Sequence, residues 1–255
     1  MSRTHRKYGW LPDLPDYRDH RYAAPRKVLA KLPRKIDLRP QCPPVLDQGE
    51  LGACTAHAIA SAHRFDQMRQ KSARDFLPSR LFIYYNERAM EHTINEDAGA
   101  MIRDGIKSIA KLGACPESLW PYDIRKFTRK PPARAYVEAE KHQAIAYQRV
   151  TQSLPQMRGC LAAGTPFVFG FTVYESFESP SVARTGRMPM PGPGEKSLGG
   201  HAVLAVGYND AKQVFIVMNS WSDGWGDRGY FYMPYAYLSD SNLADDLWAV
   251  TIVET

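Results

Sequence analysis

The chain has 255 residues, of which 44% are hydrophobic, 24% charged and 11% aromatic, and its formal net charge is +6. This composition excludes wholesale disorder, a collagen-like fibre and a coiled coil. No stretch of about eighteen uninterrupted apolar residues predicts a membrane span, and the first residues lack the apolar stretch of a cleavable signal peptide. We therefore expect a cytoplasmic protein, or one exported by a route that needs no cleavable signal peptide.

Residues 1–31 hold eight Lys or Arg residues against three Asp residues. This basic N-terminal extension is rich in Pro and aromatic residues and has no helical or strand periodicity, so we expect an extended segment that packs on the body. It is interpreted either as a pro-like segment that occludes a cleft or as a strap that joins two lobes. Its charge and aromatic residues also allow capture of an anionic ligand, although no nucleic-acid-binding fold accompanies it.

The four cysteines are scattered along the chain and form no C-x-x-C pair, and no histidine pair stands near them at metal-ligand spacing. We therefore expect neither a metal nor an organic cofactor. Cys42, Cys115 and Cys160 are interpreted as buried or free thiols, with disulfide pairing among them left open. Cys54 stands apart because of its sequence context.

Taken in chain order, the front of the sequence predicts helices and the back predicts strands. Residues 53–70 are rich in Ala and free of Gly and Pro, which favours a buried helix. Apolar periodicity predicts further helices, and runs of β-branched and aromatic residues between turn signals predict strands. The expected helices are 53–70, 78–90, 101–112 and 153–163. The expected strands are 167–173, 201–208, 213–218, 229–233 and 247–253, with a long loop at 179–200.

Cys54 is a candidate nucleophile because it stands at the first turn of the expected helix 53–70. The helix dipole favours a thiolate there, but it contributes at most about 2 kcal/mol. Lowering a thiol pKa from about 8.5 to about 3.5 requires about 7 kcal/mol. A cationic neighbour must supply the difference, which predicts a histidine on another element, oriented by a hydrogen-bonding partner.

The residues that such a site needs occur in three segments, 47–54 (DQGELGAC), 200–203 (GHAV) and 219–230 (NSWSDGWGDRGY). In this order they resemble the papain-like (C1) cysteine peptidases, specifically their leaderless bacterial branch, and the resemblance covers 32–255. It implies an α+β papain-like two-lobe fold. A mainly helical lobe would span about 45–130 and a mainly β lobe about 145–255, with the active-site cleft between them.

The resemblance also implies a role for each matching residue. Cys54 would attack the scissile carbonyl as a thiolate paired with the His201 imidazolium, and His201 would then protonate the leaving amine. Asn219 would orient the His201 ring, and Gln48 would donate a hydrogen bond to the oxyanion. Trp221 would shield the His201–Asn219 contact from water. The expected substrate-binding residues are Gly99, Ala100, Met101, Gly200 and Trp221.

The chain departs from the family pattern around Cys54. Leu51 stands where many family members have a cysteine, so that family disulfide cannot form, and Thr55 and His57 replace aromatic residues. His57 is an alternative base because it lies three residues further along the same expected helix. His201 is preferred, since His57 would sit behind the nucleophile rather than beside the substrate.

Together these residues predict a cysteine endopeptidase that hydrolyses peptide or protein substrates through an acyl-thioenzyme and is regulated, like a zymogen, by residues 1–31. Two alternatives stay open. One is a specialised deamidase or isopeptidase that acts on one protein target. The other is a non-enzymatic binding module whose basic segment captures an anionic ligand. We expect a monomer. The resemblance implies that Ala100 and Met101 line the second subsite, so a hydrophobic preference there is our hypothesis.

Overall fold

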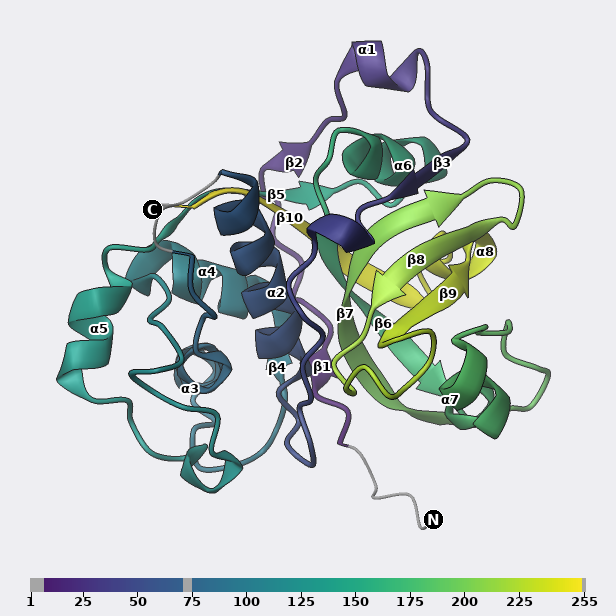
Figure 1. Cartoon of the computed structure of the whole chain (residues 1–255). Coiled ribbons are helices and arrows are strands. Elements are labelled where there is room, and N and C mark those ends of the chain that lie inside the picture. The colour runs from purple at the N-terminus through teal and green to yellow at the C-terminus, as the bar shows by residue number, and fades with distance from the viewer. Residues whose placement is uncertain (1–6, 71–74, 254–255) are drawn as a thin grey trace.

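The computed structural model describes residues 7–70 and 75–253 and shows helices gathered beside a large sheet (Figure 1). The α-helices are α1 (Arg26–Leu29), α2 (Cys54–Arg69), α3 (Arg80–Met90), α4 (Ile102–Leu112), α5 (Ala133–Ala139), α6 (Leu154–Ala162), α7 (Pro180–Thr185) and α8 (Tyr235–Leu238). The strands are β1 (Trp10–Leu11), β2 (Arg21–Tyr22), β3 (Lys35–Asp37), β4 (Ala100–Met101), β5 (Ala144–Val150), β6 (Phe167–Tyr174), β7 (Ser197–Asn209), β8 (Val214–Met218), β9 (Tyr230–Pro234) and β10 (Ala244–Val253).

Helix α2 lies between the helical part and the sheet, packing against α3 and α4 on one side and against β7 and β10 on the other. Nearly all of its residues from Cys54 to Gln67 are buried, because its many alanines let the neighbouring backbones approach closely. Helix α3 begins at an N-cap, where Ser79 Oγ accepts a hydrogen bond from the Phe82 N–H (3.1 Å). Within the described part of the chain, no helix combines the length and apolarity needed to cross a membrane.

The large sheet has the strand order β2-β5-β10-β6-β7-β8-β9, with β3 attached to β7. Its neighbouring strands are antiparallel except β2 and β5, which run parallel. Phe167, Phe169 and Phe171 of β6 are fully buried, and the register places Phe171 opposite His201 of β7. The helical part on one side and the antiparallel sheet on the other confirm the expected α+β two-lobe architecture (Figure 1).

The four helices expected from the sequence correspond to α2, α3, α4 and α6, and the five expected strands overlap β6 to β10. The expectation of a continuous loop at 179–200 was wrong, because this stretch contains α7 and the start of β7. Ser179 caps α7 by accepting from the Val182 N–H (3.3 Å), and Pro180 suits the first turn of a helix. Strand β5 was missed because most of its described side chains are half-buried, which weakens the hydrophobic contrast.

The N-terminal arm, which we define as the described residues 7–31, touches both halves of the molecule (Figure 1). Its strand β1 pairs with β4 in the helical part, and its strand β2 pairs with β5 in the sheet, both in parallel. Asp19 forms an ion pair with Arg103 of α4 (2.6 Å), and Asp13 Oδ2 accepts from Trp248 Nε1 of β10 (2.9 Å). The arm therefore links the two halves through backbone pairing and charge.

Two buried carboxyl groups meet where the arm crosses β10. Asp246 Oδ2 accepts from Trp10 Nε1 (3.1 Å) and from the Asp13 N–H (2.7 Å), both in the arm. Arg149 donates to Asp246 Oδ1 (2.9 Å) and so offsets part of the negative charge. Burial, with the nearby Asp13 carboxyl as a second cause, raises the pKa of Asp246 to about 7. Near neutral pH, the Asp246 carboxyl group is therefore protonated in part of the molecules.

The glycine that ends α4 gives a direct test of the packing between α4 and α5. Gly113 has a φ of 76°, and a Cβ there would lie 1.6 Å from the backbone oxygen of Ala139. We expect Gly113→Ala to lower the free energy of unfolding by about 2 kcal/mol more than Gly164→Ala, measured by urea denaturation. Gly164 is the matched control, since its φ is 80° but no atom lies within 4 Å of its added Cβ. Equal losses would contradict this packing.

Candidate active site

Cys54 is the first residue of α2, and a tight turn leads into it. Gly49 has a φ of 62°, which glycine adopts without strain, and its N–H donates to Asp47 Oδ1 (2.9 Å). Helix α2 packs against β7, and the backbone N–H of Ala202 on β7 lies near enough to Cys54 to lower the pKa of its thiol. Since Ala202 follows His201, the predicted nucleophile and the predicted base come from elements that pack against each other.

His201 lies on β7, and Asn219 lies directly after β8. His201 Nε2 donates to Asn219 Oδ1 over 2.8 Å, and Asn219 Oδ1 also accepts from the Ser220 N–H (2.8 Å). A proton on Nε2 leaves Nδ1 of the neutral ring as the basic nitrogen. Trp221 stacks on the His201 ring with centroids 5.0 Å apart and is itself 2% exposed. The arrangement suits a histidine whose tautomer is fixed and whose hydrogen bond is shielded from water.

Gln48 is fully buried, and its side-chain amide is fixed at both ends. Its Oε1 accepts from Ser220 Oγ (2.7 Å), which aims Nε2 the other way. Nε2 donates to the backbone oxygens of Leu51 (3.0 Å) and of Lys7 in the arm (3.2 Å). Sequence reasoning did not single out Ser220, whose signal was only its place between Asn219 and Trp221. Gln48 is thus held as a donor to a peptide carbonyl oxygen, as an oxyanion donor must be.

The arm crosses the region where these side chains meet. The Gly9 N–H lies near the Cys54 thiol and acts to lower its pKa, and the Gly9 carbonyl accepts from the Ala100 N–H of β4 (2.8 Å). The Tyr8 ring lies 6.0 Å from the His201 ring and 6.2 Å from the Trp221 ring, centroid to centroid. Cys54 has no exposed surface beneath this segment. Backbone of the chain itself therefore covers the predicted nucleophile.

The expected substrate-binding residues line the path of the arm. A Cβ on Gly99 would lie 2.3 Å from the Gly9 oxygen, and one on Gly200 would lie 2.4 Å from the Trp10 oxygen. Gly99 also has a φ of 78°, so glycine is required there on two counts. Met101, the last residue of β4, is paired with the last residue of β1. These positions accept a close backbone strand, which in this structure is the arm.

The environment of Cys54 favours its neutral form. Complete burial raises the pKa of the thiol to about 11, although the N–H groups of Ala202, Gly9 and Thr55 act in the opposite direction. Burial beneath the arm therefore opposes the thiolate that the sequence predicts at neutral pH. The physical reason is desolvation, because the sequence reasoning counted the helix dipole and an imidazolium but not the loss of water over the thiol.

His57 is a poor candidate for the base. Its Nδ1 donates to the Ala53 oxygen (2.9 Å), and its Nε2 accepts from Arg80 Nη1 (3.0 Å). Burial, followed by the charge of Arg80, lowers the pKa of His57 to about 3. Tyr122 packs edge-on against the His57 ring (4.9 Å) and donates to the Gln48 backbone oxygen (2.9 Å). His57 thus has a structural role, in which its hydrogen bond to the Ala53 oxygen stabilises the turn before α2.

Burial raises the pKa of the other three thiols too, so none of them is an alternative nucleophile by acidity. All four cysteines are free, which answers the open question of pairing among Cys42, Cys115 and Cys160. Among the described residues, no cluster of three or more His, Cys, Asp or Glu side chains has a geometry that would hold a metal ion.

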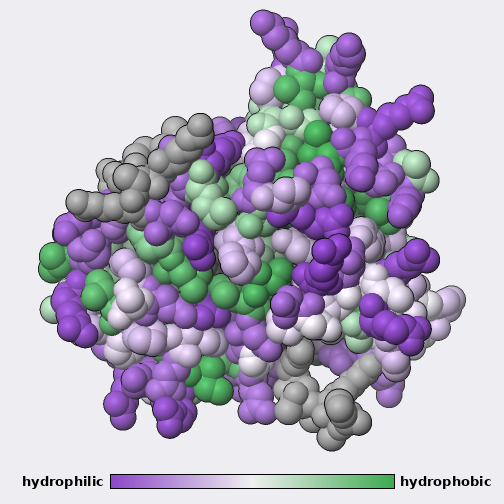
Figure 2. Space-filling view, in the orientation of Figure 1, coloured by the Kyte–Doolittle hydropathy of each residue, from purple (hydrophilic) through white to green (hydrophobic). Residues whose placement is uncertain are grey.

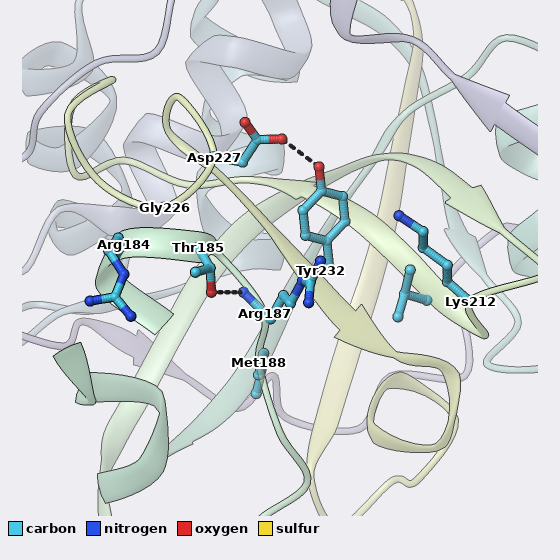
Figure 3. A pocket seen from close by; sticks show the side chains of 9 residues that line it. Arg184, Thr185, Arg187, Met188, Lys212, Gly226, Asp227 and Tyr232 are labelled. Atoms are coloured by element: carbon cyan, nitrogen blue, oxygen red, sulfur yellow. Dashed lines mark hydrogen bonds between the residues drawn. The ribbon is translucent and has the colours of Figure 1, made fainter. Parts of the chain in front are cut away.

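A separate cavity of about 840 Å³ lies on the β side of the molecule, between α7 and β9 (Figure 3). Arg184, Arg187 and Lys212 bring positive charge to its walls, and Tyr232 reaches Asp227 across it (Figure 3). None of the predicted catalytic or substrate-binding residues lines this cavity. The cavity is therefore separate from the candidate active site, which is covered by the arm.

Comparisons with known proteins agree with this geometry. Residues 32–250 match the papain family cysteine protease family. An uncharacterized peptidase C1-like protein of Acanthamoeba polyphaga mimivirus is 44% identical over 98% of this chain and 88% of its own length. A cathepsin B-like protein of Giardia intestinalis is 29% identical over 89% and 78%. The crystal structure of xylellain, a cysteine protease from Xylella fastidiosa, superposes with a TM-score of 0.90, at 44% identity over 98% of both chains. The chain belongs to the papain family of cysteine proteases.

Proposed function

We propose that the chain is a cysteine endopeptidase that uses Cys54 as nucleophile and His201 as acid and base, and that its N-terminal arm keeps it latent. One observation carries this proposal: peptide backbone already occupies the two groups that a substrate would use. The Lys7 oxygen accepts from Gln48 Nε2 (3.2 Å), and the Gly9 N–H lies close enough to Cys54 to lower the pKa of its fully buried thiol. Membership of a cysteine protease family supports peptide or protein as the substrate class.

Hydrolysis would proceed in two steps once the arm is displaced. The Cys54 thiolate attacks the scissile carbonyl carbon, and the carbonyl oxygen takes hydrogen bonds from Gln48 Nε2 and the Cys54 N–H. His201 gives its proton to the leaving amine as the C–N bond breaks, which leaves an acyl-thioenzyme. His201 then takes a proton from water, whose oxygen attacks the thioester and releases the acid. Asn219 keeps the His201 ring in one orientation throughout.

We divide the chain into a regulatory segment, 1–31, and a catalytic domain, 32–255, with a mainly helical lobe at about 45–130 and a mainly β lobe at about 145–255. Latency by the arm is supported by two glycines that allow its close approach, Gly9 and Gly99. A Cβ on Gly9 would lie 1.8 Å from the Gly52 oxygen, and one on Gly99 would lie 2.3 Å from the Gly9 oxygen. The arm thus fits closely against the backbone at Gly52, two residues before Cys54, and against the backbone at Gly99.

The two alternative functions have less support in the contacts of the site. A deamidase or isopeptidase would use the same residues, and no contact in the site favours it over peptide hydrolysis. Capture of an anionic ligand by the arm is disfavoured where its cations are paired: Lys7 with Asp97 (2.9 Å) and Arg18 with Asp16 (2.8 Å). A monomer stays the prediction for the assembly. Figure 2 shows one face of the molecule, on which hydrophilic side chains surround the hydrophobic ones.

Covalent labelling tests the assignment of Cys54 and His201. We expect an epoxysuccinyl thiol-protease inhibitor to modify Cys54 alone among the four cysteines, as read by peptide mass spectrometry. His201→Ala should lower the labelling rate at least about a hundredfold. Without the imidazole, nothing accepts the proton of the Cys54 thiol and no cation stabilises the thiolate. The exposed His92, changed to Asn, serves as the control and should label like the unmodified chain. Modification of another cysteine, or an unchanged rate in His201→Ala, would refute the assignment.

A single methyl group tests latency in the full-length chain. Gly9→Ala places a Cβ 1.8 Å from the Gly52 oxygen, so the arm must move away from Cys54. We expect the labelling rate of Cys54 and the peptidase rate to rise at least about tenfold. Gly224→Ala is the control, since the nearest atom to its added Cβ is Ser222 Oγ at 3.6 Å. If Gly9→Ala and Gly224→Ala behave alike, the arm does not restrict access to Cys54.

A further inference from the structure

Asp97 places a negative charge at the edge of the cleft, and the mechanism proposed above does not use it. It lies in the loop between α3 and β4, and its side chain is 9% exposed. Its Oδ1 accepts from the Gly52 N–H (3.0 Å) and from the Tyr84 hydroxyl (2.5 Å). Its Oδ2 pairs with Lys7 Nζ of the arm at 2.9 Å and has one longer contact, with the Gly52 nitrogen (3.3 Å).

The loop that carries Asp97 is rigidly supported. Arg88, fully buried, donates to the backbone oxygens of Ile94 (3.0 Å) and Glu96 (2.8 Å). Its guanidinium also stacks over the Tyr84 ring at 4.0 Å from the centroid. Since Tyr84 in turn donates to Asp97, the carboxylate is fixed by its neighbours before any ligand arrives. A charge held in one place and partly shielded from water discriminates between ligands better than a mobile surface charge.

Lys7 shows which part of a substrate this carboxylate would meet. The Lys7 carbonyl oxygen accepts from Gln48 Nε2 (3.2 Å), the proposed oxyanion donor, while the Lys7 ammonium reaches Asp97. In a substrate, the carbonyl that faces the oxyanion donor belongs to the residue before the scissile bond. One lysine side chain therefore spans the distance from that carbonyl position to Asp97, whichever way the rest of the backbone runs.

We propose that Asp97 is a specificity-determining residue, which selects peptides with Lys or Arg immediately before the scissile bond. The inference rests on the proposed function of Cys54 and Gln48. When the arm leaves, Oδ2 of Asp97 loses its cation, and a substrate ammonium or guanidinium replaces it. Lys7 of the arm thus forms the same ion pair with Asp97 that the Lys or Arg side chain of a substrate would form. This ion pair also contributes to holding the arm over Cys54.

Two matched peptide substrates test this inference. They differ only in the residue before the scissile bond, which is Lys in one and norleucine in the other, so the chain lengths agree and only the charge differs. We measure kcat/KM with the full-length chain, with and without Gly9→Ala. The expected preference for Lys over norleucine is at least about tenfold, and a peptide with Glu at this position should be the poorest substrate of the three.

Asp97→Asn identifies the carboxylate as the source of the preference. The amide oxygen can still accept from the Gly52 N–H and the Tyr84 hydroxyl, so the site keeps its shape while the charge is lost. In the Gly9→Ala chain, where the arm is already displaced, we expect Asp97→Asn to reduce the preference for Lys to about twofold or less and to change norleucine cleavage by less than about threefold. Glu50→Gln is the control, because it removes a charge from an exposed side chain in the turn before α2 and should leave the preference intact.

The outcomes separate this inference from the proposed function. Equal cleavage of the Lys and norleucine peptides by the unmodified chain overturns the role of Asp97 and leaves the peptidase standing, whether or not Asp97→Asn folds. An unchanged preference in Asp97→Asn, or an equal loss in Glu50→Gln, also overturns it. If neither peptide is cleaved and Cys54 is not labelled, the proposed function fails and the inference fails with it.

Discussion

In our account, the burial of the Cys54 thiol beneath the arm determines both whether substrate can reach the thiol and whether the thiol is protonated. Cys54 has no exposed surface, and the Gly9 backbone of the arm lies beside its thiol, where the Gly9 N–H acts to lower its pKa. Desolvation of this kind penalises the charged form, and it outweighs the donors that surround the sulfur. In our account the same contact hides the nucleophile from substrate and keeps it protonated, so a single displacement of the arm reverses both effects.

The rest of the structure makes that contact possible. The close packing of α2 against β7 brings Cys54 next to the His201 backbone, and the register of β6 with β7 supports the ring from below with Phe171. The arm can lie this near because glycines at 9, 99 and 200 leave room for backbone against backbone. Gly170 does the same for the Trp10 ring, to which a Cβ would approach within 2.0 Å.

Charge fixes the arm on either side of Cys54. On one side, Lys7 meets Asp97 at the edge of the cleft. On the other, Asp13 and Trp10 meet Asp246, whose pKa burial raises to about 7. Since protonation relieves the crowding of two buried carboxyl groups, this second contact is strongest in acid and weakens as the pH rises through about 7. The two contacts therefore differ in kind, one an ion pair and the other a proton-dependent contact.

Local sequence signals were enough to predict the main helices and strands. They also nominate Cys54, His201, Asn219 and Gln48 as the candidate site, because those residues stand in short motifs. The course of the arm was not predictable, since it depends on glycines far apart in the sequence that become neighbours only after folding. The roles of Ser220 and Asp97 were not predicted for the same reason. Ser220 acts through a hydrogen bond to the distant Gln48, and Asp97 through an ion pair with the distant Lys7. The raised pKa of Cys54 likewise follows from tertiary burial, to which a sequence motif gives no access.

The most direct test of the central claim is the protonation state of Cys54, read from the ¹³Cβ chemical shift of the labelled cysteine and assigned with Cys54→Ser. Our account predicts a thiol in the unmodified full-length chain from about pH 6 to about pH 9, and a thiolate already at about pH 7 when Gly9→Ala displaces the arm. A thiolate at neutral pH in both chains would contradict it, because burial beneath the arm would then not control the nucleophile.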